Sequence, residues 1–208
     1  MKKFYLFIST IVLCLLTAPN LYSVADPDTI VASDDAHTYS SNLTKNTGSW
    51  GNLAVKNSGS EIRYIYVKFD LRGLTNVAES VIYSFTSKVS DSTQNNTLGL
   101  HMVNSTDWSE STLNWENQPD FTVDPFTTVD VLTKSYFSEY QVDLTQTVKN
   151  LLFSGDSILS FALKAKTSSY ILFDVRASEN SNADEHPRLF FTYKDVSANQ
   201  EITLSAES

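Results

Sequence analysis

The feature of this sequence that most constrains its fold is a strict two-residue alternation of apolar and polar side chains. It is clearest between residues 63 and 71, where one face of an extended chain would carry Ile65, Val67, Phe69 and Leu71. The opposite face would carry Tyr64, Tyr66, Lys68 and Asp70. This pattern predicts a half-buried β-strand whose apolar face packs on a core.

The same alternation recurs near residues 81–85, 98–102, 159–163, 171–175 and 189–193. Clusters of turn-forming residues separate these segments. One segment has a helical period instead, in which Thr145 is suited to cap a short helix that Gly155 ends. We therefore predict an all-β fold, an antiparallel β-sandwich of the jelly-roll type with one short helix. A closed barrel is the main alternative.

The N-terminus has the pattern of a secretory signal peptide. Two lysines precede an apolar run at residues 4–16, and small residues lead to a cleavage site after Ala25. The run is too short for a comfortable membrane span, and Leu13 precedes Cys14 where a lipoprotein signal needs a small residue. We expect residues 1–25 to be removed, which leaves a cysteine-free chain that is secreted or periplasmic and is not stably inserted in a membrane.

Removal of residues 1–25 takes away two lysines and no acidic residue, so the net charge changes from −9 to −11. Nucleic acid and anionic membranes are poor partners for such a chain. Any polyanion would have to meet a local basic patch or a bridging cation. The composition shows no linker or repeat before a polar, glutamate-rich end, so we expect one domain at residues 26–195 and a frayed tail at residues 196–208.

Two of the three tryptophans lie within the segment from Trp108 to Pro119. Acidic, hydroxyl and amide residues separate the two indoles and a proline follows, which is typical of an ordered loop that buries its rings between β-strands. The alternative is that one indole stacks on a sugar ring. We expect a structural role, in which the loop helps to close the sandwich, for Trp108, Glu110, Trp115 and Pro119.

Seven segments occur in an order that is typical of one family: residues 34–39 (DDAHTY), 50–55 (WGNLAV), 63–71 (RYIYVKFDL), 108–119 (WSESTLNWENQP), 141–145 (QVDLT), 173–179 (FDVRASE) and 187–189 (PRL). Together they resemble the DNRLRE domain, also classed as carbohydrate-binding module family 96, from about Asp28 to Tyr193. The tryptophan loop is similar to the family's Trp-x-Glu-x-(Ser/Thr)-(Leu/Ile)-x-Trp-x-x-x-Pro. The chain departs from the family at Trp50, where tyrosine is usual, and at residues 174–179, which do not copy its Ser-x-Glu segment.

This resemblance implies a β-sandwich that binds polysaccharide. Alginate is the best-known ligand of the module, and uronate-rich or sulfated glycans are wider candidates. Such modules are commonly appended to polysaccharide lyases or cell-surface proteins. Because this chain leaves no room for a catalytic domain beside the module, we expect a free-standing glycan-binding protein.

We expect the glycan on the polar face of the predicted strands, where cations alternate with tyrosines. Arginine offers a carboxylate two parallel hydrogen bonds, lysine a point charge, and tyrosine a flat face with a hydroxyl, which together suit uronates. The alternative is that these residues form ordinary solvated strand faces. The expected ligand-binding residues are Arg63, Tyr64, Tyr66, Lys68, Lys164, Lys166 and Arg176.

Carboxylates near both ends of the chain predict a calcium site. The first and last strands of a sandwich often meet, and carboxylate oxygens are ligands that calcium prefers. We assign the ion to Asp35 and Glu179, and we expect no other cofactor. The alternative is that these are solvated loop carboxylates.

Two other classes of function stay open. A polysaccharide lyase that acts on uronates by β-elimination needs a group that neutralises the carboxylate and a base for the C5 proton, roles that Arg or His and Tyr or Lys could fill. The histidines are His37, His101 and His186. Because the sequence has no nucleophile motif, zinc spacing or phosphate loop, we expect a non-catalytic protein. A structural cell-surface, matrix or adhesin domain would share the fold without a defined sugar site.

Overall fold

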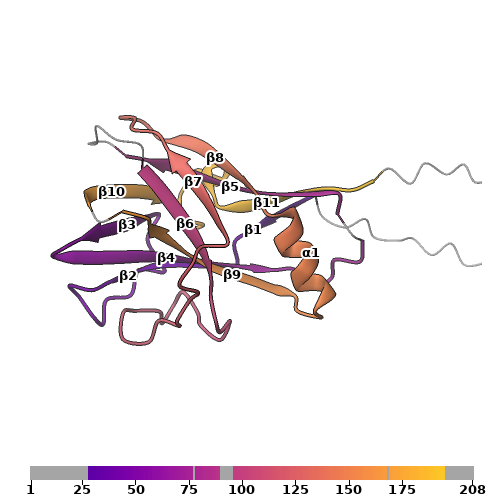
Figure 1. Cartoon of the computed structure of the whole chain (residues 1–208), viewed down its shortest axis with the longest axis horizontal. Helices are drawn as coiled ribbons and strands as arrows, with labels where there is room; N and C mark the ends of the chain where they lie inside the picture. The colour runs from indigo at the N-terminus through magenta and orange to yellow at the C-terminus, as the bar shows by residue number, and fades with distance from the viewer. Residues whose placement is uncertain (1–27, 77, 90–95, 168, 195–208) are drawn as a thin grey trace, which may run out of the picture.

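The computed structural model describes residues 28–76, 78–89, 96–167 and 169–194, and these residues form a sandwich of antiparallel strands with one α-helix at its end (Figure 1). The predicted signal peptide and the predicted tail at residues 196–208 lie outside the described residues. No helix in the described part of the chain is long and apolar enough to cross a membrane.

The first layer of the sandwich has β4 (Glu61–Asp70) near its centre. β2 (Asp34–Tyr39) and β9 (Ile158–Ala165) pair with β4, and β6 (Asn96–Met102) and β7 (Thr127–Val131) continue the sheet beyond β9. The pairing places Val67 between Asp35 and Phe161. Each of these named pairs is antiparallel, as the alternation predicts.

The second layer is built around β5 (Ser80–Lys88). β8 (Ser138–Asp143) pairs with β5, as do β11 (Arg188–Thr192) and β10 (Ser169–Arg176); β1 (Thr29–Val31) extends the sheet beyond β11 and β3 (Asn52–Ser58) beyond β10. A short hairpin of three paired positions joins β3 to β4, so the chain passes there from one layer to the other.

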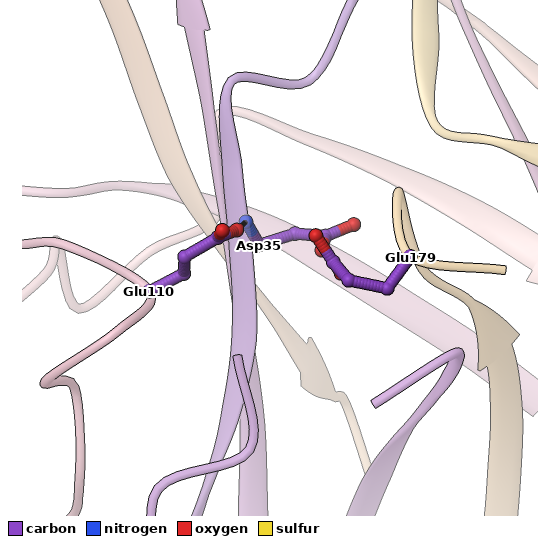
Figure 2. A group of neighbouring side chains, drawn as sticks. All are labelled: Asp35, Glu110 and Glu179. Atoms are coloured by element: carbon purple, nitrogen blue, oxygen red, sulfur yellow. Dashed lines mark hydrogen bonds between the residues drawn. The ribbon is translucent and has the colours of Figure 1, made fainter. Parts of the chain in front are cut away.

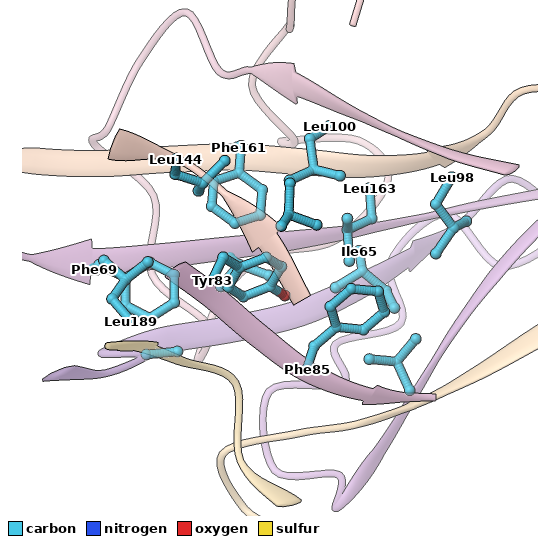
Figure 3. Close-up of a cluster of buried hydrophobic side chains, with 14 of the residues drawn as sticks. Ile65, Phe69, Tyr83, Phe85, Leu98, Leu100, Leu144, Phe161, Leu163 and Leu189 are labelled. Carbon is cyan, nitrogen blue, oxygen red and sulfur yellow. The ribbon is translucent and has the colours of Figure 1, made fainter. Parts of the chain in front are cut away.

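The alternating apolar residues of both layers meet in one core (Figure 3). Phe69 and Phe161 of the first layer lie with their ring centroids 5.9 and 5.0 Å from Tyr83 of the second layer. All three rings are fully buried. The core therefore confirms the predicted inward faces of the strands at residues 63–71, 81–85 and 159–163, and the architecture confirms the antiparallel β-sandwich.

The predicted helix is present as α1 (Thr145–Phe153), and Gly155 follows it with a φ of 88°. The prediction that Thr145 caps it is wrong. Leu144 occupies the cap position and makes no side-chain cap hydrogen bond, while the Thr145 hydroxyl accepts a hydrogen bond from the Val81 backbone N–H. Thr145 therefore attaches the helix to β5 instead of capping it.

The tryptophan loop lies between β6 and β7 and covers the outer face of the first layer. A bridge between Val103 and Phe121 closes its base, and Trp108 packs with its ring centroid 5.9 Å from that of Tyr66. The Trp108 indole N–H donates to the Ser160 hydroxyl on β9 at 3.0 Å. Trp108 and Tyr66 thus belong to a second apolar cluster, separate from the core of the sandwich. The sequence predicts a loop that closes the sandwich but does not predict this cluster.

Other contacts of the loop follow the same face of the sheet. The Tyr66 hydroxyl donates to the Pro119 carbonyl oxygen at 2.9 Å, and Trp115 stacks on Tyr64 with a centroid distance of 5.5 Å. Trp108 is 8% exposed, whereas Trp115 is only half-buried. The structural role of the loop is thus carried mainly by Trp108.

We expect Trp108→Ala to destabilise the fold strongly, because it removes a buried indole and leaves the Ser160 hydroxyl under the loop without its donor. The expected loss in free energy of unfolding is about 3–5 kcal/mol, measured by urea denaturation. Trp50→Ala is the matched control, since Trp50 is 37% exposed and its truncation should cost far less. Equal losses in the two variants would contradict the second cluster as a stabilising core.

Candidate functional site

An open groove of about 390 Å³ lies against the outer face of β3 and β10 and reaches the neighbouring end of β2 and β4. Trp50, just before β3, and Tyr39, at the end of β2, stand on one side of it. Leu172 of β10 lines the groove as well and is 37% exposed. The groove thus offers aromatic and apolar surface to solvent at a place where the sheet is otherwise polar.

The two aromatic rings of the groove are held in a cluster with cations. The Tyr39 and Trp50 centroids are 6.2 Å apart in an edge-to-face arrangement. The Arg63 guanidinium lies 4.3 Å from the Tyr39 ring, and Lys45 Nζ lies 5.2 Å from the Trp50 ring. The rings are therefore fixed in position while Trp50 keeps part of its surface exposed.

Strand register brings further cations onto the same face. Arg63 of β4 lies opposite Lys56 of β3, and both form ion pairs with Glu61 at 2.8 and 2.7 Å. Although burial raises the pKa of Glu61, hydrogen bonds from Lys56, Arg63 and Ser41 outweigh it and lower that pKa to about 2. Glu61 is therefore ionised at neutral pH and holds the two cations beside the groove.

The cationic surface continues along β10 and β5. Arg176 donates to the Asn52 amide oxygen at 2.7 Å and pairs with Glu185 at 2.6 Å, while Lys88 lies 3.8 Å from Asp174. Five cations lie on or beside this face, and four of them pair with a carboxylate: Lys56 and Arg63 with Glu61, Lys88 with Asp174, and Arg176 with Glu185, while Lys45 lies over Trp50. In a chain with a net charge of −9, such a group of cations offers anions a local point of attraction.

His37 lines the groove but is almost fully buried behind the aromatic pair. Its ring centroid is 4.5 Å from that of Tyr39, and neither ring nitrogen has a hydrogen-bond partner in the described part of the chain. Burial and then the charge of Arg63 lower the pKa of His37 to about 3. His37 is therefore neutral at physiological pH, so it does not contribute to the positive charge.

A second feature lies close by: the carboxylates of Asp35, Glu110 and Glu179 converge (Figure 2). Each offers an oxygen within 4.8 Å of the others. Asp35 comes from β2, Glu110 from the tryptophan loop, and Glu179 from the segment after β10. The cluster thus joins three segments that are far apart in the sequence.

Hydrogen bonds hold all three carboxylates, and Glu179 accepts from the Ser178 hydroxyl at 2.9 Å. The Glu110 carboxylate accepts from the Asp35 backbone N–H at 3.0 Å, and Asp35 accepts from the Ser178 N–H and hydroxyl at 2.9 and 3.0 Å. Burial, and then the charge of Glu179, raise the pKa of Asp35 to about 8. Burial also raises the pKa of Glu110. Three ionised carboxylates at this spacing would repel one another, and a shared proton or a bound cation would relieve that repulsion.

The donor set fits a hard divalent cation. Calcium takes carboxylate and carbonyl oxygens at about 2.4 Å, so two oxygens on opposite sides of the ion stand about 4.8 Å apart. The carboxylate oxygens of this cluster lie within 4.8 Å of one another, which is close enough for the three residues to share one such ion. Asp35 and Glu179, which the sequence predicts as calcium ligands, are thus brought together, and Glu110 joins them although the sequence assigned it a structural role.

The cluster and the groove share a boundary at Gly51. The Asn180 side chain, next to Glu179, donates to the Gly51 carbonyl oxygen at 2.9 Å, and the Ala177 N–H donates to the same oxygen at 3.3 Å. A Cβ at Gly51 would lie 3.3 Å from the Asn180 Cα. The segment that carries Glu179 therefore supports the backbone that presents Trp50.

The structure separates the predicted ligand residues into two groups. Arg63 lines the groove and Arg176 lies on the same face as the groove. The other residues belong to the first layer: Tyr64, Tyr66 and Lys68 lie on β4, Lys164 lies on β9, and Lys166 follows the end of β9.

Two of the predicted ligand residues, Tyr66 and Lys68, are engaged by the tryptophan loop. Tyr66 is 0% exposed beneath the loop, and burial is the main cause that raises the pKa of its hydroxyl. The Lys68 ammonium donates to the Trp108 carbonyl oxygen and lies 3.6 Å from Asp34, so it is bound within the protein. The loop covers both residues, and alternation along β4 could not reveal that cover.

The sequence did not assign to binding Tyr39 and Trp50, which line the groove, or Lys56 and Lys88, which lie outside it on neighbouring strands. Trp50 had a signal, since it is the tryptophan that stands outside the double-tryptophan segment and departs from the family's usual tyrosine. The other histidines are engaged elsewhere: His101 Nδ1 lies 2.7 Å from the Thr122 carbonyl oxygen and His186 Nε2 lies 2.6 Å from that of Asn180.

The raised pKa of Asp35 predicts how stability depends on pH when no divalent cation is present. The folded state holds the Asp35 proton up to about pH 8, whereas the unfolded chain releases it near its ordinary pKa of 3.8. The folded state binds more protons in that range, so the free energy of unfolding should fall as pH rises, by up to about 1.4 kcal/mol per pH unit.

The lowered pKa of His37 makes the free energy of unfolding rise with pH, but only below the ordinary histidine pKa of 6.5. The effect of Asp35 should therefore be measured between about pH 7 and 8, by urea denaturation in EDTA. Asp35→Asn is expected to remove this slope, and calcium is expected to raise the stability of the native protein most at the upper end of the range. A slope that persists in Asp35→Asn would show that another group causes it.

The sequence model of carbohydrate-binding module family 96 matches residues 26–193. A gellan lyase from Bacillus sp is 34% identical over 137 residues, which cover 64% of this chain and only 5% of that enzyme.

Two solved structures are more distant. A xylan-binding module of family CBM15 shares 11% identity with a TM-score of 0.43, covering 81% of this chain and 99% of that one. The CBM22-1–GH10 modules of Clostridium thermocellum xylanase 10B, complexed with xylohexaose, share 13% identity with a TM-score of 0.35, covering 83% and 30%. The family match spans most of the sequence, and the chain therefore belongs to carbohydrate-binding module family 96.

Proposed function

We propose that this module binds an acidic polysaccharide, such as alginate or another uronate-rich glycan, along the groove on the outer face of β3 and β10. The observation that carries the proposal is the placement of two cations, Lys45 and Arg63, beside an exposed tryptophan in a strongly acidic chain. A sugar ring would pack on Trp50, and its carboxylate would lie near Arg63 and Lys45.

The arrangement of charges favours a polymer over a single anion. The cations are spread along the strands from Lys45 beside Trp50 to Arg176 beside Asn52. Most already have a carboxylate partner, so each adds a modest attraction instead of forming one deep anion pocket. Successive uronates would meet successive weak sites, which suits a repeating chain.

We also propose that calcium occupies the cluster of Asp35, Glu110 and Glu179 and assists binding indirectly. The ion would neutralise carboxylates that otherwise repel a uronate polymer, and it would hold the Glu179 segment against the Gly51 backbone beside Trp50. The signal-like residues 1–25 support a further proposal, that the protein works in the periplasm or outside the cell, where such polymers occur.

Affinity electrophoresis against alginate, pectate, ulvan and chondroitin tests the groove. We expect an acidic glycan to retard the native protein, and Trp50→Ala to lower the affinity about tenfold or more, since a ring at the centre of a binding surface carries much of the energy. Lys45→Gln should lower it less. Trp115→Ala and Lys166→Gln, on the opposite layer, are the matched controls and should bind normally. The proposal would be contradicted if Trp50→Ala were still retarded while the two control variants were not. The glycan would then bind the layer that carries the tryptophan loop.

Chelation tests the role of calcium. EDTA should weaken retardation by the acidic glycan, and added calcium should restore it. Glu179→Gln should bind in the way that the EDTA-treated protein does, because the loss of one ligand carboxylate weakens the cation site. If EDTA changes neither the binding nor the thermal stability of the native protein, the cluster does not hold calcium.

A uronate lyase is the second candidate function, and the meeting of His37, Tyr39 and Arg63 in the groove is the observation that favours it. Burial of both His37 ring nitrogens opposes it, because they cannot reach a substrate in this arrangement. Incubation with the same glycans should therefore produce no absorbance of unsaturated uronates. Absorbance that Tyr39→Phe abolishes would instead establish the lyase, and failure of every glycan to retard the protein would favour a structural matrix or adhesin domain.

A further inference from the structure

The layer that forms the glycan groove continues past it to the turn between β7 and β8 (residues 132–137). Ala54 of β3 and Asp174 of β10 line the groove and are paired, and Lys88 of β5 is paired with Asp174 on the other side. Continued by one residue, the pairing of β5 with β8 places Phe137 opposite Lys88. A row across β3, β10 and β5 therefore leads from the groove to the β7–β8 turn.

Phe137 lies between two cations at the far end of this row. The Arg176 guanidinium is 3.6 Å from the centroid of its ring, and Lys88 Nζ is 4.7 Å from it. Each cation also has a carboxylate partner within the protein. The two cations are thus held in place on the outer face of the sheet, between the groove and the turn.

The turn presents an exposed ring with a lysine beside it. Tyr136 is 62% exposed, and Lys134 Nζ lies 5.4 Å from the centroid of its ring. This repeats the arrangement at Trp50, which is 37% exposed and has Lys45 Nζ at 5.2 Å. Neither lysine forms an ion pair in the described part of the chain. The groove and the turn therefore each offer a flat ring and a cation without a carboxylate partner, which suits a uronate.

The backbone of the turn is anchored to the sheet. The Lys134 N–H donates to the Val89 carbonyl oxygen at 2.9 Å, and Thr133 forms a bridge with Val89. The Lys134 ammonium donates to the Ser138 hydroxyl at 3.2 Å. Tyr136 is thus exposed on a fixed backbone, which lowers the entropy cost of packing a ligand on its ring.

We propose that the turn is a second glycan subsite, at which Tyr136 and Lys134 bind a sugar residue of the same acidic chain that packs on Trp50. The inference rests on the proposed glycan groove and adds the length of glycan that the surface requires. Neighbouring strands are about 4.8 Å apart, so the path from β3 to β8 is about 14 Å long. One sugar ring cannot span that path, whereas a longer oligosaccharide occupies both subsites at once and gains affinity.

NMR titration with disaccharides and hexasaccharides of alginate and of pectate tests the second subsite. We expect the native protein to bind a hexasaccharide about tenfold or more tighter than the disaccharide. Tyr136→Ala should weaken hexasaccharide binding about fivefold or more and leave the disaccharide affinity unchanged, because the disaccharide occupies only the groove. Lys134→Gln should act in the same direction, whereas Trp50→Ala should weaken binding at both lengths.

Two further variants separate binding from folding. Tyr136→Phe keeps the ring and should bind the hexasaccharide as the native protein does. Phe153→Ala removes a ring that is 95% exposed at the end of α1, so it is the matched control and should bind normally at both lengths. Because Tyr136 is 62% exposed, the thermal unfolding temperature of Tyr136→Ala should stay close to that of the native protein.

The outcomes distinguish the subsite from the groove on which it rests. If Trp50→Ala weakens hexasaccharide binding and Tyr136→Ala does not, the second subsite is overturned and the groove stands. The same holds if Tyr136→Ala weakens both lengths equally, because its effect would then not depend on the longer chain. If the native protein binds neither hexasaccharide, the groove and the subsite are overturned together.

Discussion

The packing of Trp108 on Tyr66 is the interaction on which the rest of the structure depends. It fixes the tryptophan loop to the outer face of the first layer and thereby places Glu110 beside Asp35. Asp35 in turn binds the Ser178 segment, and that segment supports the Gly51 backbone beside Trp50. A buried indole on one sheet thus determines the geometry of a groove on the other.

This chain of contacts explains why a family signature need not be a binding site. The loop that carries the family's signature is anchored by two buried residues, Trp108 and Leu113, and it meets the carboxylate cluster through Glu110. A Cβ at Gly48 would lie 2.2 Å from the Glu110 carbonyl oxygen, so the segment before Trp50 also packs tightly on the loop. The signature segment therefore acts as a scaffold for the backbone beside the groove.

Sequence patterns were sufficient for the core but not for the outer faces. The alternation along β4 predicts which side of the strand carries Ile65 and which carries Tyr66, because that follows from backbone geometry. It cannot tell whether a loop from elsewhere covers the polar side, and for that reason Tyr66 and Lys68 were assigned to a ligand. Arg63 reaches the groove for a reason that the pattern does not contain, because the β3–β4 hairpin joins its strand to the other layer.

The sequence predicts that the carboxylates of Asp35 and Glu179 meet because the first and last strands of a sandwich often lie together. In the structure they meet for a different reason. Glu179 follows β10, which pairs with β3 and β5, and it reaches Asp35 through the turn at Ser178. The third member, Glu110, depends on the loop, so no sequence spacing could indicate it. Long-range packing, rather than local pattern, thus decides both candidate sites.

The three indole N–H resonances of the protein provide the most direct measurement of the central claim, that glycan binds beside Trp50. In a titration with an oligouronate followed by NMR, the account predicts that the Trp50 indole signal shifts while those of Trp108 and Trp115 stay nearly unchanged. A shift of the Trp115 signal with an unchanged Trp50 signal would contradict it, because binding would then lie on the face that carries the tryptophan loop.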